Sequence, residues 1–173
     1  MPNIWLIGDT HFYHENILKY ENRPFSSVDE MNKALISNWN SKVKSRDKII
    51  VLGDFCFGAI QHAKEILDQL NGYKVLVMGN HDTVSPKRFI EAGFDEVYRY
   101  PIIYDGFYIL SHEPMYVNSN MPYANIFAHV HSNKAYADAS EQTFCVSVER
   151  PALNYYPIEF EKVKRIMESY RDK

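Results

Sequence analysis

The chain has 173 residues, a formal net charge of −3, 46% hydrophobic residues and 24% charged residues. These values are ordinary for a soluble globular protein, and the length predicts a single domain over residues 1–173. Such a weakly acidic chain lacks the basic surplus of a non-specific nucleic-acid binder, and its apolar runs are too short to cross a membrane. We therefore expect neither nucleic acid nor membrane as an obvious partner.

The cysteines and the N-terminal residues favour a cytoplasmic protein. Cys56 and Cys145 are too few for a disulfide framework or a cysteine zinc site, so we expect both to be reduced. The N-terminus enters a strand-like run at once, without the basic region, apolar core and cleavage site of a secretory signal.

The first half of the chain alternates predicted strands and helices. Apolar runs predict strands over 3–8, 48–52 and 74–78. Ser27-Val28-Asp29-Glu30 has the form of a capping box and is followed by apolar residues at helical spacing up to Val43. Two further helices are predicted, one with an apolar face from Ile60 to Leu70 and one between Pro86 and Gly93. This alternation predicts parallel strands joined by helices.

The second half changes character. Tyr104-Asp105-Gly106-Phe107 lies between two apolar-aromatic runs and predicts a hairpin with an Asp-Gly turn. Further strands are predicted over 125–128 and 143–148, and a last helix over 159–170. We expect an α/β sandwich with mixed sheets and flanking helices.

Five short islands contain residues able to bind a divalent metal. They are Asp9-Thr10-His11, Gly53-Asp54, Gly79-Asn80-His81-Asp82, His112 and His129-Val130-His131. Three of them directly follow apolar runs, and loops at strand ends are where α/β enzymes place their chemistry. In the Asp-x-His and His-x-His islands, the i, i+2 spacing puts both side chains on one side of an extended backbone. The sequence therefore predicts a metal site assembled from several loops at one edge of a sheet.

The islands together offer enough ligands for two metal ions. Two dications about 3.5–4 Å apart need a bridging carboxylate together with imidazole or amide ligands. Nitrogen and oxygen ligands of this kind suit Mn²⁺, Fe, Zn²⁺, Co²⁺ or Ni²⁺ better than Ca²⁺. The candidate ligand residues are Asp9, His11, Asp54, Asn80, His112, His129 and His131.

The order of these motifs, D-x-H, GD, GNHD, H and H-x-H from residue 9 to residue 131, resembles the calcineurin-like metallophosphoesterase superfamily. The resemblance implies a four-layer α/β/β/α sandwich with mixed sheets. It also assigns Asp9, His11 and His131 to a first metal, Asn80, His112 and His129 to a second, and Asp54 to both. Ala128 departs from the pattern, because the family usually has Gly before the last His-x-His pair.

The resemblance further implies a catalytic role for His81, beside the scissile phosphate, with Asp82 supporting it. A hydroxide bridging two divalent metals, Mn²⁺ being the most expected, would attack phosphorus. The predicted function is thus hydrolysis of a phosphoester, with a nucleotide among the candidate substrates. A phosphodiester is favoured over a monoester, because the family core uses most of the chain and leaves little for a large cap.

Three residues outside the motifs are candidate substrate contacts. His14 follows His11 by three residues, and Arg23 offers a planar bidentate group that suits phosphate. The alternatives are a satisfied histidine and a polar loop. Tyr116 follows His112 in a loop, where it would either stack on a nucleobase or contribute to packing.

Two other functions compete with this prediction. A non-catalytic scaffold of the same fold is the main alternative, although His81 and all seven ligand positions are intact. A metal-dependent amidohydrolase also uses His-x-His pairs, but such an enzyme resembles a longer barrel with the pair near its N-terminus.

Overall fold

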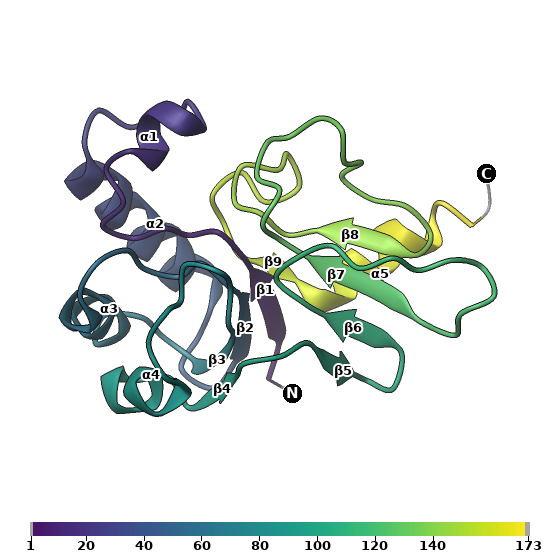
Figure 1. The fold of residues 1–173 in the computed structure, drawn as a ribbon, viewed down its shortest axis with the longest axis horizontal. Coiled ribbons are helices and arrows are strands. Elements are labelled where there is room, and N and C mark those ends of the chain that lie inside the picture. The colour runs from purple at the N-terminus through teal and green to yellow at the C-terminus, as the bar shows by residue number, and fades with distance from the viewer. Residues whose placement is uncertain (1, 172–173) are drawn as a thin grey trace.

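Two mixed β-sheets form the centre of the structure, a computed structural model that describes residues 2–171 (Figure 1). The first sheet has the order β4-β3-β2-β1-β9. Its strands are β1 (Ile4–Ile7), β2 (Lys48–Leu52), β3 (Tyr73–Val77), β4 (Glu96–Tyr98) and β9 (Ile158–Glu159). Strands β1 to β4 are parallel, and β9 pairs antiparallel with β1. The carboxyl ends of the parallel strands therefore meet at one edge of this sheet.

The second sheet has the order β5-β6-β7-β8. It contains β5 (Ile102–Tyr104), β6 (Tyr108–Leu110), β7 (Ala124–Phe127) and β8 (Thr143–Cys145). Only β5 and β6 are antiparallel, and they form the predicted hairpin. Asp105 and Gly106 both have positive φ angles, 52° and 66°, as a tight Asp-Gly turn requires.

Helices flank the two sheets. They are α1 (Ile17–Tyr20), α2 (Val28–Lys42), α3 (Ile60–Leu67), α4 (Pro86–Ala92) and α5 (Phe160–Glu168). In Figure 1, α2, α3 and α4 lie beside the first sheet, whereas α5 packs with β1, β9 and β8. The predicted class, an α/β fold with mixed sheets and flanking helices, is confirmed. Among residues 2–171, no helix is long and apolar enough to cross a membrane.

Two local predictions need adjustment. The Ser27 hydroxyl accepts the Glu30 N–H at the start of α2, as predicted, but the Glu30 carboxylate reaches back to the Ser26 N–H instead of that of Ser27. The strand predicted over 143–148 ends at Cys145, because the chain then leaves β8 and pairs Ser147 with Gly8 at the end of β1. That bridge brings the two sheets together at the edge where the metal motifs lie.

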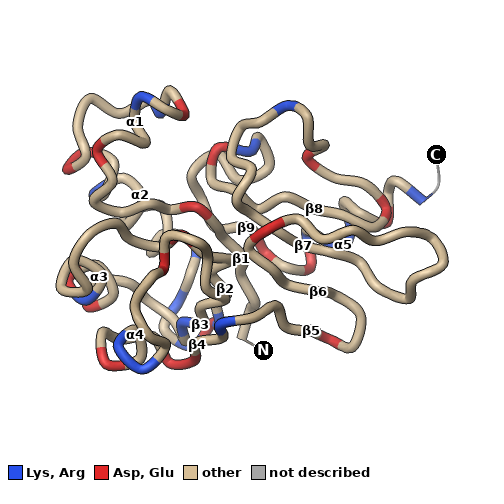
Figure 2. The backbone as a smooth tube through the Cα atoms, viewed as in Figure 1, with Lys and Arg blue, Asp and Glu red and all other residues tan. Residues whose placement is uncertain are grey.

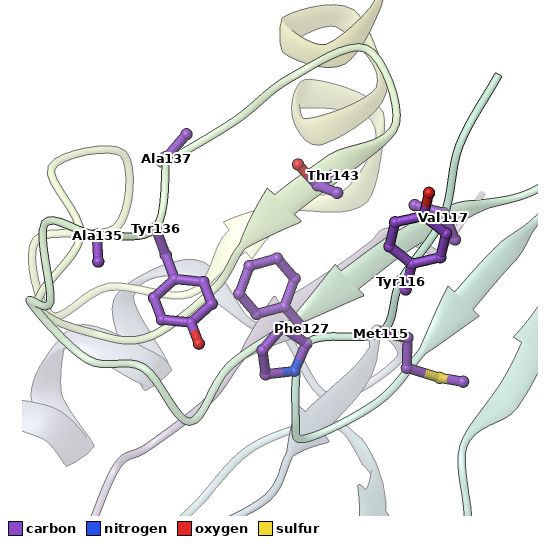
Figure 3. A pocket seen from close by; sticks show the side chains of 9 residues that line it. Met115, Tyr116, Val117, Phe127, Ala135, Tyr136, Ala137 and Thr143 are labelled. Carbon is purple, nitrogen blue, oxygen red and sulfur yellow. The ribbon is translucent and has the colours of Figure 1, made fainter.

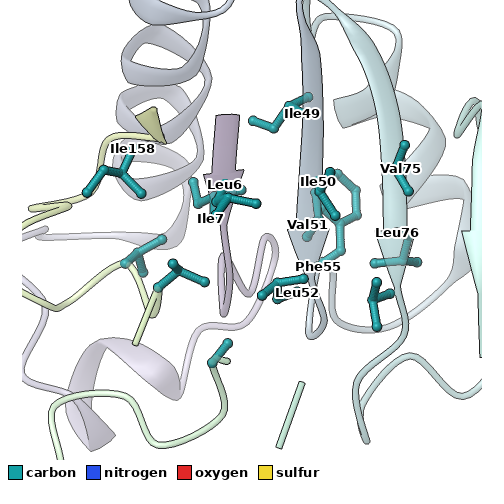
Figure 4. Close-up of a cluster of buried hydrophobic side chains, with 14 of the residues drawn as sticks. Leu6, Ile7, Ile49, Ile50, Val51, Leu52, Phe55, Val75, Leu76 and Ile158 are labelled. Atoms are coloured by element: carbon teal, nitrogen blue, oxygen red, sulfur yellow. The ribbon is translucent and has the colours of Figure 1, made fainter. Parts of the chain in front are cut away.

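The core consists of buried side chains from both sheets, shown for the first sheet in Figure 4. Ile49, Ile50, Val51 and Leu52 are fully buried in succession along β2. Such a continuous apolar run is typical of a parallel strand covered on both faces. Strand ends held this firmly provide a rigid base for the loops that follow them.

Candidate metal centre

The first cluster of possible metal ligands contains Asp9, His11 and His131. One ligand atom from each of the three lies within 4.8 Å of the others. Asp9 and His11 come just after β1, and His131 comes just after β7. The cluster therefore joins the ends of strands from both sheets.

The second cluster contains Asp54, His112 and His129, which meet the same distance limit. Asn80 joins this cluster, since its Oδ1 lies 3.0 Å from His112 Nε2 and 3.1 Å from His129 Nδ1. These residues follow β2, β3, β6 and β7, so four strand ends contribute to the second cluster.

Asp54 links the two clusters. Its Oδ2 lies 3.5 Å from Nε2 of His11 and 3.3 Å from Nε2 of His112. All seven residues predicted as ligands thus converge on one place. The carboxyl ends of β1, β2 and β3 lie at the same edge of a parallel sheet, and the loops after β6 and β7 of the second sheet meet them there. This arrangement fits two cations that share one carboxylate.

Several buried atoms of the first cluster lack a hydrogen-bond partner among the described residues. Within residues 2–171, Oδ1 and Oδ2 of Asp9 and Nε2 of His11 are buried without a hydrogen bond. Leaving polar atoms unpaired in a buried site is costly, on the order of 1–3 kcal/mol each. A divalent cation would supply the missing partner to all three atoms, so these residues fit a metal.

The backbone of the ligand loops adopts a conformation that side chains usually avoid. Positive φ angles occur at Asp9 (56°), His11 (48°), Asp54 (52°), His129 (67°) and His131 (47°). A left-handed conformation costs a non-glycine residue about 1–2 kcal/mol, and such residues gather at functional sites. Here the unusual backbone turns the ligand side chains toward one another.

Two glycines leave room for the ligands. A Cβ on Gly53 would overlap the His112 ring, and one on Gly79 would overlap the Asp54 carboxylate. Ala128, the departure from the family pattern, has its methyl against Gly8, where a second Cβ would overlap it. The small residue at position 8 therefore accommodates the larger one at position 128, and no ligand is displaced.

Burial and neighbouring charges shift the pKa values of three candidate ligands, Asp54, His112 and His11. Burial favours the neutral acid of Asp54, but the hydrogen bond and charge of His112 outweigh it and lower the pKa of Asp54 to about 2. Burial also opposes a charge on His112, yet Asp54 and Asp9 raise its pKa to about 9. By contrast, burial lowers the pKa of His11 to about 2, so this imidazole is neutral and can bind a metal.

His81 lies exposed at the mouth of the site. Its backbone N–H donates to Asp54 Oδ1 at 2.9 Å, and its ring centre is 5.5 Å from that of His11. Asp82 was expected to support His81, but its carboxylate binds backbone groups of the neighbouring loops. Its carboxylate accepts the N–H groups of Asp54 (2.8 Å), Gly79 (2.8 Å) and Phe55 (3.2 Å). Asp82 therefore ties together the two loops that carry Asp54 and Asn80.

His14 lies inside the site, whereas Tyr116 lies on the surface. The Nδ1 atoms of His14 and His11 are 3.1 Å apart, and the ring of His14 stacks on Phe57 with a centre distance of 4.2 Å. Burial lowers the pKa of His14, which favours its neutral form. Tyr116 is exposed in the loop that follows His112.

Arg23 was expected in an open loop, where it could contact a phosphate, but its side chain is buried. Its guanidinium is fully buried and donates to the carbonyls of Asp9 (2.7 Å) and Thr10 (2.9 Å). It also donates twice to Glu149 Oε1, at 2.6 Å from Nη2 and 3.0 Å from Nε. A direct contact with substrate phosphate would require these bonds to break, because the same N–H groups serve both.

Glu149 is the main residue that the sequence reasoning missed. The same Oε1 that binds Arg23 lies 3.1 Å from Nδ1 of His131. Glu149, His131 and Glu21 also form a third group with ligand atoms within 4.8 Å of one another. Glu149 stands outside every motif, and no local pattern around it signals its role.

The comparisons with known proteins agree with this geometry. The model of the calcineurin-like phosphoesterase family matches residues 2–166. An uncharacterised protein of Methanocaldococcus jannaschii is 38% identical over 177 residues, which cover 97% of this chain and 93% of the relative. The Gene 66 protein of Mycobacterium phage L5 is 32% identical over 89 residues, covering 50% of this chain and 42% of that protein.

Two crystal structures share the fold. A protein of unknown function from Aquifex aeolicus superposes with a TM-score of 0.71 and 26% identity, covering 96% of this chain and all of its own. A nuclease from Pseudomonas putida, at 17% identity, has a TM-score of 0.51 and covers 74% of this chain and 61% of its own. Because the family model spans nearly the entire sequence, the chain belongs to the calcineurin-like phosphoesterase family.

Proposed function

We propose that the protein hydrolyses phosphoesters with two divalent metal ions. Asp9, His11 and His131 would hold the first ion, Asn80, His112 and His129 the second, and Asp54 both. The observation that carries this proposal is the pair of clusters meeting at Asp54, with buried atoms on Asp9 and His11 that make no hydrogen bond within residues 2–171. Mn²⁺ is the first metal to test, followed by Fe, Zn²⁺, Ni²⁺ and Co²⁺.

Such ions would supply positive charge for the phosphate and acidify a bound water molecule. The protein residues around them have separate tasks. His81, exposed at the mouth, would hold a proton and deliver it to the departing oxygen. Asp82 fixes the backbone of the Asp54 and Gly79 loops and so keeps the ligands in place.

Two of the substrate contacts predicted from the sequence, His14 and Arg23, receive different roles. His14 lies beside His11 and stays a candidate contact for the phosphate. For Arg23 we propose a positioning role, since its N–H groups hold the loop of Asp9 and Glu149. A phosphodiester remains the favoured substrate, because Asn80, His81 and His129 are exposed and leave an open approach to the site.

The distribution of charge bears on the size of the substrate, and the two cysteines bear on the cell compartment. In Figure 2, basic and acidic positions are interspersed over the helices and loops, which suits a small phosphoester better than a long polyanion. Cys56 and Cys145 are free, which is compatible with the reducing conditions of the cytoplasm.

A screen of metals against substrates tests the function. Metal-free protein would be incubated with Mn²⁺, Ni²⁺, Zn²⁺ or Mg²⁺ and bis-p-nitrophenyl phosphate, cyclic nucleotides or simple monoesters. We expect metal-stimulated hydrolysis that favours diesters. His81→Ala should retain two metals but lower kcat by roughly 10²–10⁴-fold, the usual scale for loss of a general acid.

Asp54→Ala is the matched variant for the metal centre, and it should lose or scramble both ions in elemental analysis. No hydrolysis by the metal-loaded wild type with any substrate class would contradict the proposal. Isolation of a tight protein partner in that case would favour the non-catalytic scaffold.

A further inference from the structure

A groove with a volume of about 430 Å³ lies on the second sheet (Figure 3). Its principal lining residues are Met115, Tyr116, Val117, Phe127, Tyr136 and Thr143. Phe127 and Thr143 lie on the face of β7 and β8 opposite the core residues Ile126 and Phe144. The groove therefore lies on the outer face of the second sheet, and none of its lining residues is a candidate metal ligand.

The chain connects this groove directly to the second cluster. Met115 and Tyr116 belong to the loop that begins just after His112, and Phe127 lies two residues before His129. Phe127 also packs with Val130, the residue between His129 and His131. The two loops that carry His112 and His129 thus form the walls of the groove.

The walls present aromatic surface to solvent. The exposed fraction is 83% for Tyr116 and 42% for both Tyr136 and Met115. In Figure 3, the Phe127 ring lies between those of Tyr136 and Tyr116, and the Phe127 and Tyr136 ring centres are 6.5 Å apart. Every residue that lines the groove is uncharged. Such a surface favours a neutral planar ring, because aromatic faces gain from stacking as well as from burial.

Hydrogen bonds hold one wall in place. Asn125, fully buried on β7, accepts the Met115 N–H at 2.8 Å and donates to the Ser111 hydroxyl at 2.8 Å. Further along the loop that carries Met115, the carbonyl of Asn118 accepts a hydrogen bond from the Gln142 side chain at 2.7 Å. The wall that carries Tyr116 is thus attached to the sheet at two points, so the groove is formed before any ligand arrives.

We propose that this groove binds the base of a nucleotide while the phosphoester lies at the metal centre. The base would stack on Tyr116 and Tyr136 above Phe127. Uncharged walls disfavour a second phosphate there, and the volume is sufficient for a ligand of nucleoside size. The proposal rests on the proposed function, which it deepens by naming nucleotide phosphoesters as the substrate class.

Calorimetric titration of the Mn²⁺-loaded protein with AMP and with ribose 5-phosphate tests the groove. The two ligands share the phosphate and sugar, so their difference reports the base alone. We expect AMP to bind about 10-fold more tightly, in line with the stacking of one base. Tyr116→Ala and Tyr136→Ala should each weaken AMP binding about 3- to 10-fold and leave ribose 5-phosphate unchanged.

Tyr100→Ala is the matched control, because Tyr100 is 73% exposed and lies in the connection between β4 and β5. Equal affinity for the two ligands, or unchanged AMP binding in both groove variants, would overturn the proposal. Equal binding of hexyl phosphate and AMP would also overturn it, since the groove would then accept any apolar group.

The titration and the hydrolysis screen can fail independently. Hydrolysis of diesters without a preference for AMP over ribose 5-phosphate would refute the groove alone. A base-dependent affinity in a protein that hydrolyses nothing would refute the enzyme and leave the groove as a nucleotide-binding site.

Discussion

Arg23 connects two parts of the first cluster of candidate ligands that lie far apart in the sequence. Its guanidinium binds the carbonyls of Asp9 and Thr10 on one side and Glu149 on the other, and Glu149 in turn contacts His131. These groups are buried, where charge-assisted hydrogen bonds hold geometry firmly. At the scale of single residues, the geometry of the first cluster of candidate ligands therefore depends on the Arg23–Glu149 pair.

Replacing Arg23 should empty the first metal site while the second remains. In Arg23→Ala, the Asp9 loop and Glu149 lose their common partner, so we expect about one bound Mn²⁺ per chain instead of two by elemental analysis. Arg23→Lys should give an intermediate affinity, because an ammonium group cannot span the same acceptors.

Arg150→Ala is a suitable control, since Arg150 is as buried as Arg23, at 4% exposure each. Its partners are Asp138 and the carbonyls of Asn133 and Tyr136. Two ions bound to Arg23→Ala with wild-type affinity would rule out the positioning role.

Asp47 forms hydrogen bonds near the amino-terminal ends of β1 and β2. These strand ends lie opposite the carboxyl ends that carry the candidate metal ligands. The Asp47 carboxylate accepts the N–H of Asn3 (2.8 Å), the N–H of Lys44 (2.9 Å) and the indole N–H of Trp5 (3.2 Å). Burial alone would raise its pKa, but these hydrogen bonds outweigh burial, and the pKa of Asp47 lies below the usual value. At the scale of elements, this one side chain fixes how the first two strands begin.

Asp47→Asn should lower the free energy of unfolding by about 1–3 kcal/mol at pH 7, because an amide accepts fewer and weaker hydrogen bonds. The folded pKa is below the unfolded one, so the contribution is complete above about pH 4 and disappears as the pH falls through the folded pKa. Urea unfolding at pH 7, 5 and 3.5 measures it.

The matched control is Asp68→Asn, whose partner Lys64 is exposed on α3 and whose effect should stay below about 1 kcal/mol. A difference between wild type and Asp47→Asn that grows as the pH falls would contradict the assignment.

The candidate metal ligands come from both sheets, so metal binding concerns the stability of the whole molecule. Asp9, Asp54 and Asn80 follow strands of the first sheet, and His112 and His131 follow strands of the second. The backbone bridge between Gly8 and Ser147 lies at the same junction. Ions held there would join the two sheets in the folded state only.

Adding Mn²⁺ to metal-free protein should therefore raise the melting temperature. An ion present at 100 times its Kd stabilises by about 2.7 kcal/mol, which for a chain of this length corresponds to roughly 5–10 °C. Calorimetric scans with Mn²⁺ and with EDTA measure the shift. Asp54→Ala should show little of it, and an equal shift in that variant would place the stabilising ion elsewhere.

The secondary structure was largely accessible to sequence reasoning because its signals are local. The apolar run at Ile49–Leu52 and the hairpin turn at Asp105-Gly106 each depend on neighbouring residues only. The short helix α1 (Ile17–Tyr20) was not predicted, since one turn between polar loops has no detectable period. The end of β8 at Cys145 was also missed, because the pairing of Ser147 with Gly8 is not visible locally.

By itself, the sequence determined the family, the order of the elements and the convergence of the seven candidate ligands, because motif order and strand ends are properties of the chain. Only the tertiary structure decided the surroundings of Arg23, Glu149 and Asp82. Arg23 and Glu149 are 126 positions apart, and their bond exists because the loop before α2 and the turn after β8 pack together. Contacts of this kind depend on packing in three dimensions, which no local pattern of residues records.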